Sequence, residues 1–136
     1  MFRFSSICAD TAKAWYTYIM KGLSRYEKVE RPWGNFERFT TNEISTVKIL
    51  TVNAGDAFSL QFHKCRDEFW HIVQGSGIVH IEETDTEARV GDQFFIPRNI
   101  KHRITGGPEG IKCLEISFGE FDENDIERFE DLYGRT

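Results

Sequence analysis

Four side chains between positions 61 and 102 are of the types that bind a divalent metal ion. Gln61 and His63 are two residues apart, so on a β-strand they project from the same face. Glu68 follows across a short turn at 64–67, whereas His102 must come from a strand that crosses the same interior. Two imidazoles, a carboxylate and an amide oxygen suit zinc, or else manganese, iron, cobalt or nickel, and leave positions for water or substrate. These four residues are the predicted metal ligands.

The residues that flank these ligands form two spaced patterns. Glycines at 55 and 75 enclose the first three ligands, and Gly91 and Pro97 precede the last. Both patterns resemble the paired motifs of the cupin superfamily, whose small β-barrel binds a metal through a His-x-His strand, a Glu on the next strand and a later His. Gln61 stands where most cupins have His, and Asn99 and Gly106 replace a usual Gly and a frequent Asn. Asn is the commonest non-Gly residue at positive φ, so the change at 99 is mild.

Further segments resemble the cupin domain of type II mannose-6-phosphate isomerases, enzymes that interconvert mannose 6-phosphate and fructose 6-phosphate with a divalent metal. The matching segments are Arg31–Gly34, Ser59–His63, Arg66–Trp70, Ile96–Pro97, Lys101–Arg103, Asp125–Asp131 and Tyr133–Arg135. After the first ligand His, the family pattern reads His-His-Arg-(Ser or Ala)-Glu-His-Trp. Here Lys64, Cys65 and Phe69 replace its three histidines.

The resemblance implies an aldose–ketose isomerase acting on a small sugar phosphate. Such a reaction moves a proton between adjacent carbons through an enediol, so the site must polarise a carbonyl or hydroxyl, which a metal can do. Arg66 matches an arginine expected to be important for the family's activity, and Lys101 lies beside a predicted ligand. Both are candidate catalytic residues that would contact the phosphate or the enediolate. No carboxylate of the motif remains as a base once Glu68 binds metal.

Other interpretations stay open. A cupin without the family's histidines could bind a sugar or other small molecule without turning it over. A metal dioxygenase is a weaker alternative. The usual iron triad consists of only two histidines and a carboxylate, so the neutral Gln61 argues against it. Cys65 shares strand parity with Gln61 and His63 and could replace Gln61 as a ligand, although a small buried thiol is the simpler interpretation. His71 and His80 fit no ligand spacing and are predicted on the outer face of the strands.

Composition excludes several partners. The 136 residues carry 17 basic and 22 acidic side chains, a net charge of −5, which argues against nucleic acid or an anionic membrane as the main partner. No apolar run approaches the roughly 18 residues of a membrane span. Three scattered cysteines do not form a disulfide framework, so a soluble protein of the reducing cytoplasm is expected.

The remaining pattern predicts how these residues are positioned. Short β-branched and aromatic runs separated by turn signals indicate about eight or nine strands, an all-β jelly-roll barrel of the cupin type over 29–136. A helix at about 10–21 is expected within an N-terminal extension over 1–28. A C-terminal helix is predicted from Asp122 or Asn124 to Gly134, because Ile126, Phe129 and Leu132 form an apolar stripe. Exposed sheet edges and the N-terminal helix favour a homodimer.

Overall fold

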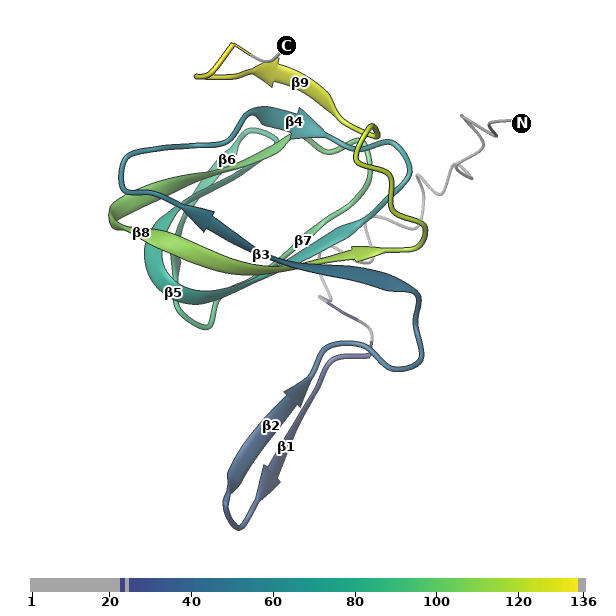
Figure 1. Ribbon diagram of the computed structural model, residues 1–136. Helices are drawn as coiled ribbons and strands as arrows, with labels where there is room; N and C mark the ends of the chain where they lie inside the picture. Colours follow the sequence, from purple (N-terminus) through teal and green to yellow (C-terminus); the bar gives the residue numbers. More distant parts are fainter. Residues whose placement is uncertain (1–22, 24, 135–136) are drawn as a thin grey trace.

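The computed structural model describes residues 23 and 25–134, and within them the chain forms only β-strands and loops (Figure 1). The all-β prediction is therefore confirmed for this part of the chain. The strands are β1 (Glu27–Arg31), β2 (Gly34–Arg38), β3 (Ser45–Val52), β4 (Leu60–Phe62), β5 (Glu68–Ile81), β6 (Thr84–Arg89), β7 (Gln93–Ile96), β8 (His102–Phe118) and β9 (Glu127–Glu130). The helix predicted at 10–21 lies outside the described residues.

Two long strands organise the body of the molecule. β5 has 14 residues and β8 has 17, and they pair antiparallel along most of their length, with register shifts at Ile72/Gln74 and Gly75/Gly77. β6 and β7 pair with β5, while β3 and β4 pair with β8 and β9 extends the sheet beyond β4. Figure 1 shows these strands curving around a common interior. The first residues of both long strands, Glu68 and His102, are predicted metal ligands.

The C-terminal helix predicted from the stripe of Ile126, Phe129 and Leu132 is wrong, because this segment forms strand β9 instead. The Phe129 ring packs against the ring of Phe62 on β4, with their centroids 5.3 Å apart. Asp122 accepts a hydrogen bond from the backbone N–H of Asn124, which closes a turn rather than capping a helix. Pairing with an available strand edge thus outweighs a weak three-residue periodicity.

An apolar core lies directly beneath the predicted ligands. Trp70, Ile72, Val79, Ile104 and Cys113 are fully buried between β5 and β8. The Trp70 ring meets the His102 ring edge-on, with centroids 5.3 Å apart. The ligand end of the barrel therefore rests on a closely packed floor, which fixes the imidazole of His102 against rotation.

The two unusual motif residues have local explanations. Asn99 adopts φ 65°, and its backbone N–H donates a hydrogen bond of 2.7 Å to the carbonyl of His63. A Cβ atom at Gly106 would lie 2.2 Å from the carbonyl oxygen of Asn53, so no larger residue fits there without a backbone shift. The first confirms the positive φ predicted for Asn99, and the second explains the absence of Asn at 106.

The hairpin formed by β1 and β2 projects from the body of the molecule (Figure 1). Trp33 at its turn is 72% exposed, and Val47 and Ile49 on β3 are 57% and 55% exposed. These apolar surfaces are compatible with the predicted homodimer, which stays a prediction. In the described part of the chain, no helix is long and apolar enough to cross a membrane.

We predict that Asn99→Ala lowers the free energy of unfolding by about 1 kcal/mol, because a Cβ-bearing residue other than Asn or Asp is strained at positive φ. Asn99→Gly is the matched control and should remain within about 0.5 kcal/mol of the parent, because glycine adopts this conformation without strain. Denaturant unfolding of the three proteins measures both values. Equal losses in the two variants would show that the Asn99 side chain, not the backbone conformation, matters.

Candidate metal centre

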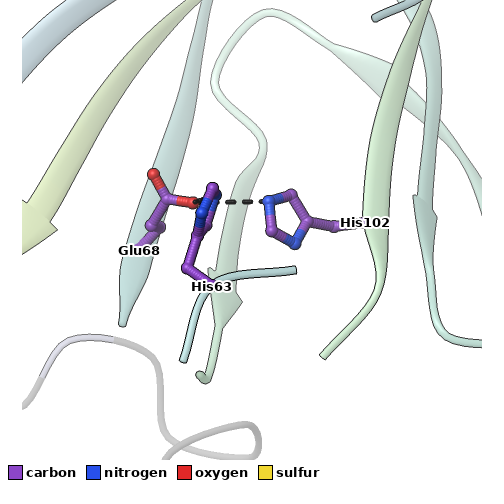
Figure 2. Close-up of side chains that lie close together, drawn as sticks. All are labelled: His63, Glu68 and His102. Atoms are coloured by element: carbon purple, nitrogen blue, oxygen red, sulfur yellow. Dashed lines mark ion pairs between the residues drawn. The ribbon is translucent and has the colours of Figure 1, made fainter. Parts of the chain in front are cut away.

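Three of the four predicted ligands converge at one end of the barrel (Figure 2). His63 follows the last residue of β4, Glu68 begins β5 and His102 begins β8. Their candidate donor atoms all lie within 4.8 Å of one another, and all three side chains are buried, with relative exposures of 2%, 1% and 1%. The side chains of the cluster are therefore shielded from bulk water.

Strand pairing fixes the positions of these residues. Gln61 lies directly opposite His102 in the pairing of β4 with β8, so both side chains are on one face. Glu68 lies opposite Ser117 in the pairing of β5 with β8, and the Ser117 hydroxyl donates a hydrogen bond of 3.1 Å to Glu68 Oε2. The same-face arrangement predicted from residue spacing is thus produced by the register of β8 against its two neighbours.

Backbone carbonyls fix the tautomers of both histidines. His63 Nδ1 is 2.6 Å from the carbonyl oxygen of Asp125, and His102 Nδ1 is 2.8 Å from that of Ile100. A carbonyl oxygen can only accept, so each Nδ1 carries the proton and donates. In the neutral imidazoles the lone pair is therefore on Nε2, which is the arrangement that metal-ligating histidines commonly have.

Both Nε2 atoms face the same carboxylate oxygen. His63 Nε2 is 2.8 Å and His102 Nε2 is 3.3 Å from Glu68 Oε1 (Figure 2). Burial alone would raise the pKa of Glu68, but the imidazoles of His102 and His63 beside its carboxylate outweigh burial and hold that pKa well below its ordinary value. The cluster thus presents an ionised carboxylate and two imidazole nitrogens to one another, an arrangement that a cation bound between them would stabilise.

Two buried atoms without partners show that the three donor residues fit a divalent metal. Glu68 Oε1 and His102 Nε2 are buried atoms without a hydrogen-bond partner in the structure. Buried polar atoms without partners are costly, and a cation bound between these lone pairs would satisfy both. Two imidazole nitrogens and a carboxylate oxygen are also the ligand types found in catalytic zinc sites.

The fourth predicted ligand, Gln61, is half-buried and lies on the same strand face as His102. Its Oε1 accepts a hydrogen bond of 2.7 Å from the Ser59 hydroxyl. Its role as a ligand stays a prediction. Cys65, the alternative to Gln61, is not among the residues whose donor atoms converge in the described part of the chain. Its backbone N–H donates to Asp125 Oδ2.

The two candidate catalytic residues lie in different surroundings. Arg66 is buried, with its Nη2 3.4 Å from His63 Nε2 and its Nε 3.7 Å from Glu68 Oε2. The Lys101 ammonium lies over the ring of Phe129, 4.0 Å from the centroid, and its proposed contact with substrate stays a prediction. Of the two, Arg66 is the one placed beside the triad.

Sequence reasoning missed two acidic residues that shape this site. The carboxylate of Asp125 accepts hydrogen bonds from the backbone N–H groups of Lys64 and Cys65, while its carbonyl orients His63. The sequence pattern places it in the predicted C-terminal helix, where these contacts would not form. Glu115 lies on the inward face of β8, where Trp70 Nε1 donates 2.9 Å to its carboxylate.

Burial and then the charge of Glu68 raise the pKa of Glu115 to about 8. The interior therefore contains two carboxyl groups with opposite pKa shifts: one held ionised by histidines and one held protonated at neutral pH. An acidic residue alternating with apolar ones in Ile111–Phe118 was the available sequence signal for Glu115.

Comparison with known proteins gives consistent matches. Residues 20–131 match the family described as mannose-6-phosphate isomerase C-terminal. The chain is 35% identical over 113 residues to the xanthan biosynthesis protein XanB of Xanthomonas campestris pv. campestris, and 36% identical over 111 residues to the alginate biosynthesis protein AlgA of Pseudomonas putida. These matches cover 82% and 80% of this chain but 24% and 23% of the relatives, so the chain spans about a quarter of their length.

A solved structure supports the fold. An uncharacterised conserved protein from Klebsiella pneumoniae with a double-stranded β-helix domain superposes with a TM-score of 0.57 at 18% identity, covering 67% of this chain and 78% of that chain. At this level of identity the likeness concerns the fold alone. It agrees with the cupin-like arrangement of antiparallel strands expected from the two motifs.

We predict that His63→Ala and His102→Ala each reduce the ratio of bound metal to protein chain by at least about 10-fold, because each removes one nitrogen donor from a three-residue cluster. His80→Ala is the matched control, since His80 pairs with Asp85 away from the cluster and should leave metal content unchanged. Elemental analysis of the purified proteins measures the ratio of metal to chain. Parent-level metal in both ligand variants would place the metal elsewhere.

Proposed function

Because the chain belongs to the mannose-6-phosphate isomerase C-terminal family, we propose that it is a metal-dependent sugar-phosphate isomerase that interconverts mannose 6-phosphate and fructose 6-phosphate. The observation that carries the proposal is the buried triad of His63, Glu68 and His102, whose lone pairs converge on one point. When bound there, a metal would polarise a carbonyl or hydroxyl oxygen of the sugar. Zinc suits this donor set, with manganese, iron, cobalt or nickel as alternatives.

The residues of the chain would orient the sugar and exclude water. His63 and His102 keep their Nε2 atoms directed at Glu68 because backbone carbonyls hold their Nδ1 protons. The apolar floor formed by Trp70 closes the site from below. A fixed arrangement of this kind lowers the entropic cost of bringing the reacting carbons to the polarising centre.

Arg66 supplies fixed positive charge at the place where negative charge develops. Its guanidinium is held by a hydrogen bond of 2.9 Å to the carbonyl of Asp122 and by stacking over Phe121, 4.5 Å from the ring centroid. These contacts set its position before substrate arrives, and its side chain reaches both His63 and Glu68. We therefore assign to Arg66 the stabilisation of the enediolate, whose charge is larger than that of the bound sugar.

The alternative function is a cupin that binds a sugar without turning it over, which the replaced family histidines suggest. The structure weakens that suggestion at two of the three positions. Lys64 is exposed, and Phe69 packs against Phe39, with centroids 5.7 Å apart. Phe69 also follows Glu68 directly on β5, so its side chain is on the opposite face of the strand. A histidine at either position would not have joined the triad.

We predict that a hexose 6-phosphate incubated with the metal-loaded protein in heavy water acquires deuterium at carbon 1 or carbon 2, because an enediol exposes the migrating proton to exchange with solvent. Nuclear magnetic resonance of the recovered sugar measures the label. Removing the metal with a chelator should abolish labelling, and adding back a divalent cation should restore it. A rise in melting temperature on adding the sugar phosphate, without any deuterium labelling, would contradict the isomerase and support a cupin that binds the sugar without turning it over.

We predict that Arg66→Ala lowers kcat by about 100-fold while changing KM much less, as expected when a fixed donor acts mainly on charge developed during the reaction. Steady-state kinetics on the metal-loaded variant measures both constants, and its metal content serves as the control for the integrity of the triad. A rise in KM with unchanged kcat would contradict the assignment and make Arg66 a contact of the ground-state sugar.

A further inference from the structure

A third basic residue, Arg128, lies in line with the metal ligands across three strands. Gln61 on β4 pairs with His102 on one side and with Arg128 on β9 on the other. Directly opposed residues of antiparallel strands project from the same face of the sheet. The side chain of Arg128 is therefore on the face that carries Gln61 and His102.

The neighbours of Arg128 confirm this orientation independently. Phe129 packs against Phe62 and lies beneath Lys101. Phe62 follows Gln61 in the sequence and Lys101 precedes His102, and both Gln61 and His102 are on the ligand face. Adjacent strand residues project to opposite faces, so Phe129 belongs to the outer surface. The bulge between Leu60 and Gln61 also places Glu130 on the outer face, where it pairs with Arg103 at 3.3 Å.

No carboxylate in the described part of the chain neutralises the guanidinium of Arg128. Its Nε atom is buried and has no hydrogen-bond partner, and none of the described carboxylates forms an ion pair with it. The other candidate cations near the site contact the protein: Arg66 lies beside Glu68, and Lys101 lies over the ring of Phe129. In a chain with a net charge of −5, a partly buried arginine without an acidic partner among the described residues is suited to bind an anion.

We propose that Arg128 binds the phosphate group of the substrate and so selects phosphorylated over unphosphorylated sugars. The inference rests on the proposed function for the identity of the sugar, but its recognition chemistry requires only a phosphate. The planar guanidinium forms paired hydrogen bonds with two phosphate oxygens. The two ends of the substrate are thereby separated: the reacting carbons lie at the triad, and the phosphate lies at β9.

Kinetics of Arg128→Gln and Arg103→Gln test this role, because Arg103 is a matched arginine that lies on the outer face and pairs with Glu130. In Arg128→Gln, KM for the hexose 6-phosphate should rise about 10- to 100-fold, the loss expected for a charge-assisted hydrogen bond, while kcat stays within about 3-fold. Arg103→Gln should leave both constants unchanged. Metal content should match the parent in both variants, and Arg128→Lys should give an intermediate KM.

A second readout uses inorganic phosphate as the probe and requires no turnover. Phosphate should raise the melting temperature of the metal-loaded parent and of Arg103→Gln relative to chloride at equal ionic strength, but not that of Arg128→Gln. This pattern in a protein without isomerase activity would refute the proposed reaction and retain the phosphate site. Normal turnover with KM and phosphate stabilisation unchanged in Arg128→Gln would overturn the role of Arg128 and leave the isomerase intact.

Discussion

Two imidazole nitrogens and one carboxylate oxygen meet in the interior of the protein, and the neighbouring strands and loops hold them together. Glu68 Oε1 faces the Nε2 atoms of His63 and His102 at 2.8 and 3.3 Å, and such a group is unfavourable in a protein interior without a cation. The fold must therefore hold three electron-rich atoms together that would otherwise separate. The long strands β5 and β8 pair antiparallel, with Glu68 opposite Ser117 and His102 opposite Ile81, and their curvature around the common interior brings Glu68 and His102 together.

Loops outside the barrel supply the remaining control. The carbonyls of Asp125 and Ile100 orient the imidazoles, and the Asp125 carboxylate fixes the turn that leads from His63 to Glu68. The segment before β9 thus stabilises a site to which it contributes no donor atom. Partners of this kind commonly change metal affinity by about 10- to 100-fold, because they set both the tautomer and the orientation of the ring.

Much of the site follows from the sequence, because alternation along a strand is a local property. The Gln61–His63 pair, the turn to Glu68 and the positive φ of Asn99 depend on a few residues each, and the structure contains the same-face arrangement. Pairing between distant strands is not encoded locally. For that reason the periodicity around Phe129 predicts a helix where the chain forms β9, and the positions of Glu115 and Arg128 follow from the register of β8 and β9. The contacts of Asp125 likewise depend on residues about 60 positions away in the sequence.

We infer that the triad binds a divalent metal through two histidine nitrogens and one carboxylate oxygen. X-ray absorption spectroscopy of the purified, metal-loaded protein tests it most directly, because it reports the elements around the metal. We expect only nitrogen and oxygen neighbours at about 2.0–2.2 Å from the metal, with the scattering pattern of two imidazole rings. A sulfur neighbour at about 2.3 Å, or a shell without imidazole scattering, would contradict it.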